Sequence, residues 1–129
     1  MESRGSLIEI IQKYINSERM TRIMSDLGIR RSLPGYAILL ELLMDECALM
    51  CGEWRRIESQ SGDVRSLSYI IKQSEYALEC AEKSGKLSNL KKYACFESEV
   101  SSKDVTLPLF ISVLSGYIVR ESTGRFKAI

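Results

Sequence analysis

The sequence of 129 residues contains no histidine. Histidine is the general base of Ser-His-Asp triads, a common metal ligand and the usual pH switch, so its absence excludes all three of these devices. The sequence also lacks a phosphate-binding loop, a dinucleotide-binding glycine motif, a nucleophile elbow and zinc-finger spacing. We therefore predict that the protein is not an enzyme and has no catalytic residue, no cofactor and no metal site.

The sequence also has almost no excess charge, with 18 Lys and Arg residues against 17 Asp and Glu residues and a formal net charge of +1. Proteins that bind nucleic acid or anionic membranes without specificity usually carry a large positive charge, which this composition does not supply. Hydrophobic residues make up 45% of the chain and charged residues 27%, close to the averages of globular proteins. We expect residues 1–129 to form a single domain.

Long apolar runs are absent as well. The run Tyr36 to Leu40, among the longest, ends at Glu41, whereas a membrane helix needs ~20 apolar residues. No apolar stretch of the secretory-signal kind follows the N-terminal residues, and neither terminus carries a lipid-attachment motif. We expect an intracellular protein, cytoplasmic or nuclear, with no membrane partner.

The sequence contains four cysteines, namely Cys47, Cys51, Cys80 and Cys95. They allow two interpretations. Cys47 and Cys51 are one helical turn apart, and two further thiolates would complete a zinc site with them. This pair lies, however, within an apolar stretch of Leu, Met and Ala, and unpaired cysteine commonly packs as a small hydrophobic residue. We therefore predict reduced, buried thiols rather than a metal site.

Apolar residues recur at helical spacing along almost the whole chain. The capping-box pattern that begins at Ser6 predicts a first helix that runs to about Asn16. Ser17 is the expected cap of a second helix, and Gly28 its left-handed exit.

The motif Ser32-Leu33-Pro34 predicts the start of a long helix that ends at about Arg56, because a Ser cap and an early proline suit a first helical turn. Outside a narrow polar strip, nearly all of its residues are apolar. A helix that is apolar around most of its circumference is buried by its neighbours. We therefore expect this helix to be the central element.

The second half of the chain continues the helical pattern, with predicted helices at about 64–84, capped by Ser61 or Asp63, and at about 88–96. The stripe expected to face the core in the longer of the two consists of Leu67, Ile70, Ile71, Ser74, Leu78 and Ala81. Residues 107–120 follow the start motif Thr106-Leu107-Pro108 and are predicted to form a last helix. This segment is also rich in β-branched and aromatic residues, so a strand pair, 109–114 with 117–120, is the alternative.

The strongest candidate for contact with a phosphate or an acidic partner is an arginine cluster: Arg19, Arg22, Arg30 and Arg31. Arginine binds phosphate and carboxylate groups through paired hydrogen bonds, which gives the cluster its chemical rationale.

Two other charged groups are interpreted as solvated helix faces. The first is a second basic stretch, made of Lys83, Lys86, Lys91 and Lys92. The second is the acidic strip Glu41, Asp45 and Glu46, which no histidine and no second acidic cluster accompany.

Three aromatic residues are candidates for a protein interface: Trp54, Phe110 and Tyr117. Trp54 lies near the predicted end of the central helix, where it either anchors a partner or closes the edge of the core, the commoner place. Phe110 and Tyr117 belong to the apolar last segment, which needs cover from the core or from another chain.

Together these patterns predict an all-α fold, a single-domain bundle of five to six helices around a central apolar helix at about residues 34–56. The function we favour is association with another protein or with a second copy of the chain, as an adaptor, inhibitor, accessory or assembly subunit. The alternative is a helical nucleic-acid-binding domain that uses the arginine cluster against phosphates, for which the basic groups must gather on one face.

Overall fold

The computed structural model describes residues 4–52, 66–94 and 105–124. In chain order the elements are α1 (Arg4–Ile15), α2 (Glu18–Asp26), α3 (Pro34–Met50), α4 (Leu67–Lys83), the short 3-10 helix η1 (Leu87–Tyr93) and α5 (Leu107–Thr123). These described ranges contain helices and no strand. The predicted all-α bundle is therefore confirmed.

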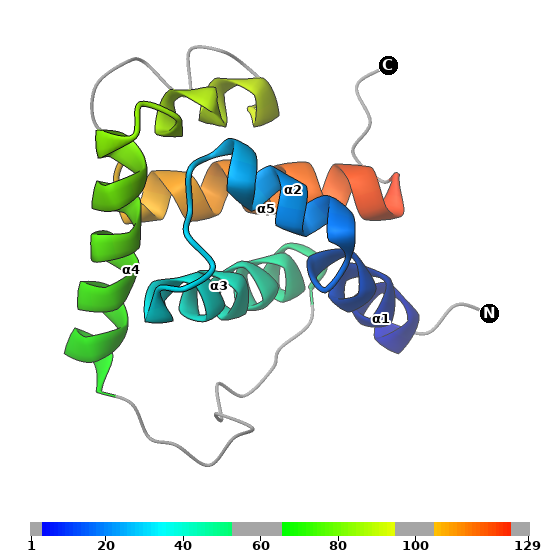
Figure 1. Cartoon of the computed structure of the whole chain (residues 1–129). Coiled ribbons are helices and arrows are strands. Elements are labelled where there is room, and N and C mark those ends of the chain that lie inside the picture. The colour runs from blue at the N-terminus through cyan, green and yellow to red at the C-terminus, as the bar shows by residue number, and fades with distance from the viewer. Residues whose placement is uncertain (1–3, 53–65, 95–104, 125–129) are drawn as a thin grey trace.

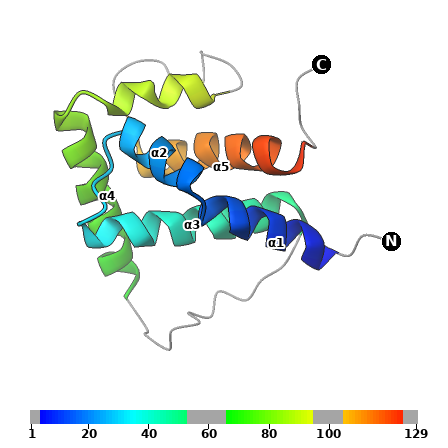
Figure 2. The same ribbon diagram turned by 45° about the vertical axis from the view of Figure 1, so that its right-hand side comes forward.

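Helix α3 lies at the centre of the bundle and packs against α4, α5 and α1 (Figure 1). Helix α5 runs beside α3, and α4 crosses the ends of both at one side of the molecule, as the rotated view in Figure 2 also shows. The short helix η1 packs on α4 and α5, and the buried face of α2 joins the same core. The expected central helix is thus present, with neighbours on several sides.

The core is formed where the apolar stripes of these helices meet. Leu39 and Leu43 of α3 are completely buried, as are Phe110 and Leu114 of α5. Complete burial of one such side chain contributes ~1.5–3 kcal/mol to folding. The contact between α3 and α5 is therefore a major source of the stability of the bundle.

Several helix boundaries agree with the sequence. The hydroxyl of Ser17 accepts a hydrogen bond from the Met20 N–H at 3.3 Å and caps α2. Gly28, after the end of α2, has a φ of +80°. Thr106 caps α5 in the same way as Ser17 caps α2. Helix α5 includes all of residues 107–120, so the strand-pair alternative is wrong.

Two predicted helix starts are wrong. Helix α1 begins at Arg4, so Ser6 lies inside the helix rather than before its first turn. The N-cap of α3 is Leu33 rather than Ser32, and no side chain makes a capping hydrogen bond there. Pro34 allows the start instead, because its ring fixes a helical φ and the N–H that it lacks would have had no partner in the first turn.

Two further boundaries lie elsewhere than predicted. Helix α3 ends at Met50 rather than at about Arg56, because Gly52 adopts a left-handed φ of +77°, which ends a helix. Helix α4 begins after Ser66, whose hydroxyl accepts a hydrogen bond from the Tyr69 N–H at 3.2 Å.

The stripe predicted to face the core from α4 is buried only in its second half. Ser74, Leu78 and Ala81 are buried, whereas Leu67 is 72% exposed and Ile71 is 39% exposed. These two residues are exposed because the N-terminal end of α4 extends past α3 (Figures 1 and 2). The first turns of α4 therefore carry apolar side chains that the described part of the bundle does not cover.

The crossing of α3 and α4 depends on Gly35 in the first turn of α3. A Cβ atom at this position would meet the backbone carbonyl of Gln73 and would lie 2.8 Å from the Cβ atom of Ala77. Real Cβ atoms do not approach other atoms so closely, so the two helices can pack at this distance only because residue 35 has no side chain.

We expect Gly35→Ala to lower the free energy of unfolding by about 2 kcal/mol, because overpacking of a tight helix contact costs ~1–3 kcal/mol. Gly116→Ala within α5 is the matched control, since its Cβ atom would meet only the flexible end of the Arg120 side chain, at 3.3 Å. Alanine is the better helix former, so this control should keep or raise stability. Urea denaturation measures both variants, and a Gly35→Ala protein as stable as the wild type would contradict the close contact.

Candidate functional site

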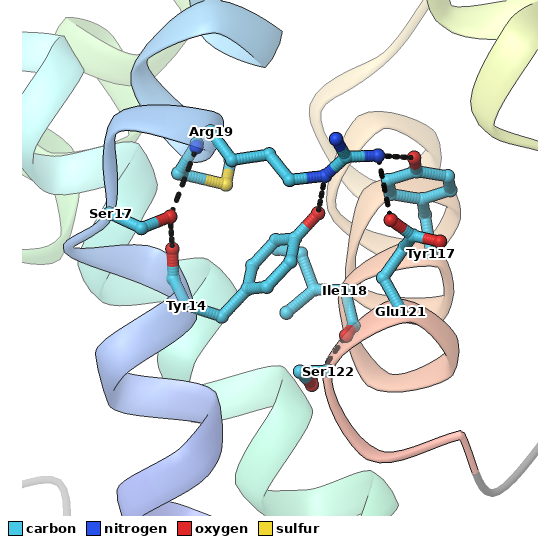
Figure 3. A network of polar contacts seen from close by, with 8 residues as sticks. Tyr14, Ser17, Arg19, Tyr117, Ile118, Glu121 and Ser122 are labelled. Atoms are coloured by element: carbon cyan, nitrogen blue, oxygen red, sulfur yellow. Dashed lines mark hydrogen bonds and ion pairs between the residues drawn. The ribbon is translucent and has the colours of Figure 1, made fainter.

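Arg19 joins three helices through its guanidinium group (Figure 3). Its Nη2 atom lies 2.7 Å from Glu121 Oε1 on α5 and donates a hydrogen bond of 3.2 Å to the Tyr117 hydroxyl. Its Nε atom donates to the Tyr14 hydroxyl of α1, also at 3.2 Å. Since Arg19 itself lies in the first turn of α2, these contacts tie α1, α2 and α5 together.

Arg19 and Tyr14 both keep their protons at neutral pH. The hydrogen bonds to Tyr14 and Tyr117 raise the pKa of Arg19 further above its already high ordinary value. Burial raises the pKa of Tyr14, an effect that the bond from Arg19 partly offsets. A phosphate that bound Arg19 would have to compete with Glu121 and with both hydroxyl groups.

The structure does not gather the four arginines of the predicted cluster into one patch. Arg19 is bound to α1 and α5, whereas Arg22, one turn later, faces η1. Arg30 and Arg31 lie in the exposed connection after α2, where the charge of Arg30 acts on Tyr76 of α4.

Arg22 instead lines a surface depression between α2 and η1. The depression has a volume of about 380 Å³, and five polar residues line it: Arg22, Ser25, Asp26, Lys86 and Asn89. We call it the α2–η1 depression. Two basic stretches that are far apart in the sequence therefore meet at this surface, one from α2 and one from the chain that leads into η1.

Asp26 connects the two walls of the α2–η1 depression. Asn89 Nδ2 donates a hydrogen bond to the Asp26 backbone carbonyl at 2.8 Å. The Tyr93 hydroxyl donates to Asp26 Oδ2 at 2.9 Å, and Lys92 Nζ lies 3.5 Å from the same oxygen. Burial raises the pKa of Tyr93 and the bond to Asp26 raises it further, so the hydroxyl keeps its proton and remains a donor.

This meeting of basic residues is not visible in the sequence. The local pattern predicts a solvated face for the lysine stretch, because it does not indicate which distant helix will lie beside it. Only the fold brings Lys86 and Lys92 next to Arg22 and Asp26.

The three aromatic interface candidates have different environments. Phe110 is completely buried in the core and is not available to a partner. The prediction that Phe110 forms a protein interface is therefore wrong. The burial of Phe110 follows from the packing of α5 on α3. Tyr117 is half-buried, and its ring meets the edge of the Tyr93 ring with centroids 4.8 Å apart. Trp54 lies outside the described residues.

The described surface instead exposes large apolar side chains elsewhere. Four of them lie on α4: Leu67, Tyr69, Ile71 and Tyr76. The other three are Ile10 of α1 and, at the end of α3, Leu49 and Met50. None of these seven residues was a candidate site in the sequence analysis.

Among the cysteines, Cys47 is fully buried and its thiol donates a weak hydrogen bond to the Ser115 carbonyl at 3.7 Å. Burial raises the pKa of Cys47 to about 12. Cys51 and Cys80 are half-buried, and Cys95 lies outside the described residues. No group of three or more acidic or thiol side chains in residues 4–52, 66–94 and 105–124 is arranged to hold a metal ion.

No helix within the described ranges has the length and apolar character that a membrane span needs. No protein-family model matches the sequence, and neither the curated proteins nor the solved structures give a significant match.

We expect Arg19 and Glu121 to be energetically coupled. Arg19→Ala and Glu121→Ala should each lower the thermal midpoint, and the double variant should lose less than the two losses combined. High salt should reduce the coupling, because the ion pair is partly exposed. The same cycle with Arg22→Ala in place of Arg19→Ala serves as control and should show additive losses, since Arg22 faces η1.

The buried thiol should make stability depend on pH in the alkaline range. Cys47 has an ordinary pKa of 9.0 and a folded pKa of about 12, so above pH 9 the unfolded chain loses a proton that the folded chain keeps. The free energy of unfolding should therefore fall as pH rises through this window, by at most ~1.4 kcal/mol per pH unit from this group. Urea denaturation between pH 8 and about 10 should show a shallower fall for Cys47→Ala, and parallel curves would contradict the assignment.

Proposed function

We propose that this protein is a non-catalytic association module that acts through the N-terminal part of α4, and that the chain it binds there is a second copy of itself. The observation that carries the proposal is the 72% exposure of Leu67 and the 39% exposure of Ile71, in the first half of a stripe whose second half is buried. Exposed apolar side chains that continue a core stripe are typical of a surface covered by another chain.

The stripe on α4 has the helical spacing that a helix interface requires. Leu67 and Ile71 are four residues apart and lie on the same side of α4 as the buried Ser74. Tyr69 and Tyr76 are exposed on the opposite side, so the first part of α4 has apolar side chains on two sides. A helix with this pattern is usually enclosed by neighbours.

The charges beside the stripe favour a second copy as the partner. Lys72, Glu75 and Glu79 are exposed and follow one flank of the stripe, with the positive charge nearer the N-terminus of α4. In a two-fold symmetric antiparallel pair the same flank of both helices meets. This flank therefore carries charges of both signs, so a second copy can offer carboxylates to Lys72 and an ammonium group to Glu75.

We infer that the protein works inside the cell, because Cys47 packs in the core as a free thiol, as cysteines of intracellular proteins commonly do. The alternative function, nucleic-acid binding by the whole arginine cluster, has less support because Arg19 is engaged within the chain.

The molar mass in solution, measured by sedimentation equilibrium over a wide concentration range, tests this function. We expect the wild type to approach the mass of a dimer and Leu67→Asp to remain a monomer. The substitution removes one leucine from each copy, so the dimer loses two buried leucines at ~1.5 kcal/mol or more each. This loss weakens the dimer at least ~100-fold. Leu49→Asp is the matched control, because Leu49 is 55% exposed but lies at the end of α3.

Charge reversal tests the orientation of the two helices. Lys72→Glu should weaken the dimer, and the combination of Lys72→Glu with Glu75→Lys should restore it. A wild type that stays monomeric at all concentrations, or a Leu49→Asp variant as defective as Leu67→Asp, would contradict the proposal.

A further inference from the structure

We propose that the α2–η1 depression is a binding site for a phosphate group, with Arg22 and Lys86 as its charged contacts and the Ser25 hydroxyl as a neutral hydrogen-bonding group. The proposal concerns a different surface from the apolar end of α4. It does not depend on self-association.

The charge balance of the α2–η1 depression favours an anion. Asp26 is the one carboxylate among its lining residues, and it already accepts the Tyr93 hydroxyl and faces Lys92 at 3.5 Å. Arg22 lies 4.0 Å from Glu18, but both side chains are largely exposed and such a pair contributes little.

Lys86 makes no ion pair with any residue of the described ranges. Arg22 and Lys86 therefore remain as two cations at the same depression, with little local negative charge to balance them.

The chemistry and the size of the depression suit a phosphate. A guanidinium group binds phosphate oxygens through two parallel hydrogen bonds, and a lysine adds a point charge. The Ser25 hydroxyl lies on the same lining and can bond a further oxygen. The volume of about 380 Å³ exceeds that of a phosphate ion, so the depression has room for one. A divalent cation is not favoured, because Asp26 is a single carboxylate that is already paired with Lys92.

The walls of the α2–η1 depression are held in place by contacts that do not involve Arg22 or Lys86. Asn89 bonds the end of α2 at 2.8 Å, and Arg120 of α5 donates to the Tyr93 carbonyl of η1 at 2.9 Å. Leu87 and Leu90 anchor η1 in the core. The two cations are thus carried by elements with fixed positions, which reduces the ordering cost of binding.

The test is a titration of the full chain with inorganic phosphate at constant ionic strength, followed through backbone amide NMR signals. We expect saturable shifts at residues 22–26 and 86–89. Arg22→Gln and Lys86→Gln should each weaken phosphate binding by about 10-fold, because each variant loses one charge-assisted hydrogen bond. Lys83→Gln is the matched control and should leave affinity unchanged, because Lys83 pairs with Glu79 on α4, outside the depression.

A gain of affinity provides a second test that a misfolded variant cannot imitate. Asp26→Asn removes the carboxylate from the lining but keeps an oxygen that accepts the Tyr93 hydroxyl, so it should bind phosphate several-fold more tightly. Absence of saturable shifts in the wild type, or equal losses in Lys83→Gln and Lys86→Gln, would overturn the proposal.

Competition identifies the source of the phosphate. Displacement of phosphate by a nucleoside monophosphate, but not by an oligonucleotide without terminal phosphates, would assign the site to small phosphate esters. Displacement by the oligonucleotide, with a steep dependence on salt, would assign it to a nucleic-acid backbone. Displacement by neither would assign the saturable site to free inorganic phosphate. These signals come from the α2–η1 depression, so they are read independently of whether the chain dimerises through α4.

Discussion

The apolar surface of α3 must be removed from water on several sides at once, and this constraint sets the positions of the other helices. Leu39, Leu43 and Cys47 are completely buried on it. Helix α5 covers it along its length, α4 crosses it at one end, and α1 packs near the other. A helix of this kind gains its stability from packing rather than from its own propensity, because each fully buried leucine contributes ~1.5–3 kcal/mol.

The place where α4 crosses α3 then determines what the surface of the molecule exposes. Gly35 rests against Gln73 and Ala77, in the middle of α4, so the residues before Gln73 extend past α3. At the other end of α4, Ser84 accepts a hydrogen bond from the Lys86 N–H at 3.3 Å as the chain turns into η1. The crossing of α4 over α3 thus leaves the apolar N-terminal end of α4 uncovered. At its other end, α4 leads the chain to Lys86 beside α2.

The sequence predicts a feature correctly when its cause lies within a few residues along the chain. It fails when the cause is a contact with a distant segment. Ser17 caps α2 through a bond to a residue three positions away, and such a pattern is visible in the sequence. Helical periodicity identified the stripe of α4 as apolar, but it contains no information about where a neighbouring helix ends, so the exposure of Leu67 was missed. Periodicity likewise did not separate the buried Phe110 from a surface residue. The meeting of Arg22 with Lys86 depends on the packing of distant segments, which no local pattern encodes.

The arginine cluster of the sequence divides into two roles once the fold is known. Arg19 fixes α2 to α1 and α5, and its hydrogen-bonding groups face partners within the chain. That attachment also places Arg22, one turn further along α2, beside Lys86 across the α2–η1 depression. Because residues three apart on a helix lie close to one another, the sequence alone could not separate an arginine that holds the helix from one that is available to a ligand. The difference arises from the position of α5, which reaches Arg19 but leaves Arg22 at the rim of the depression.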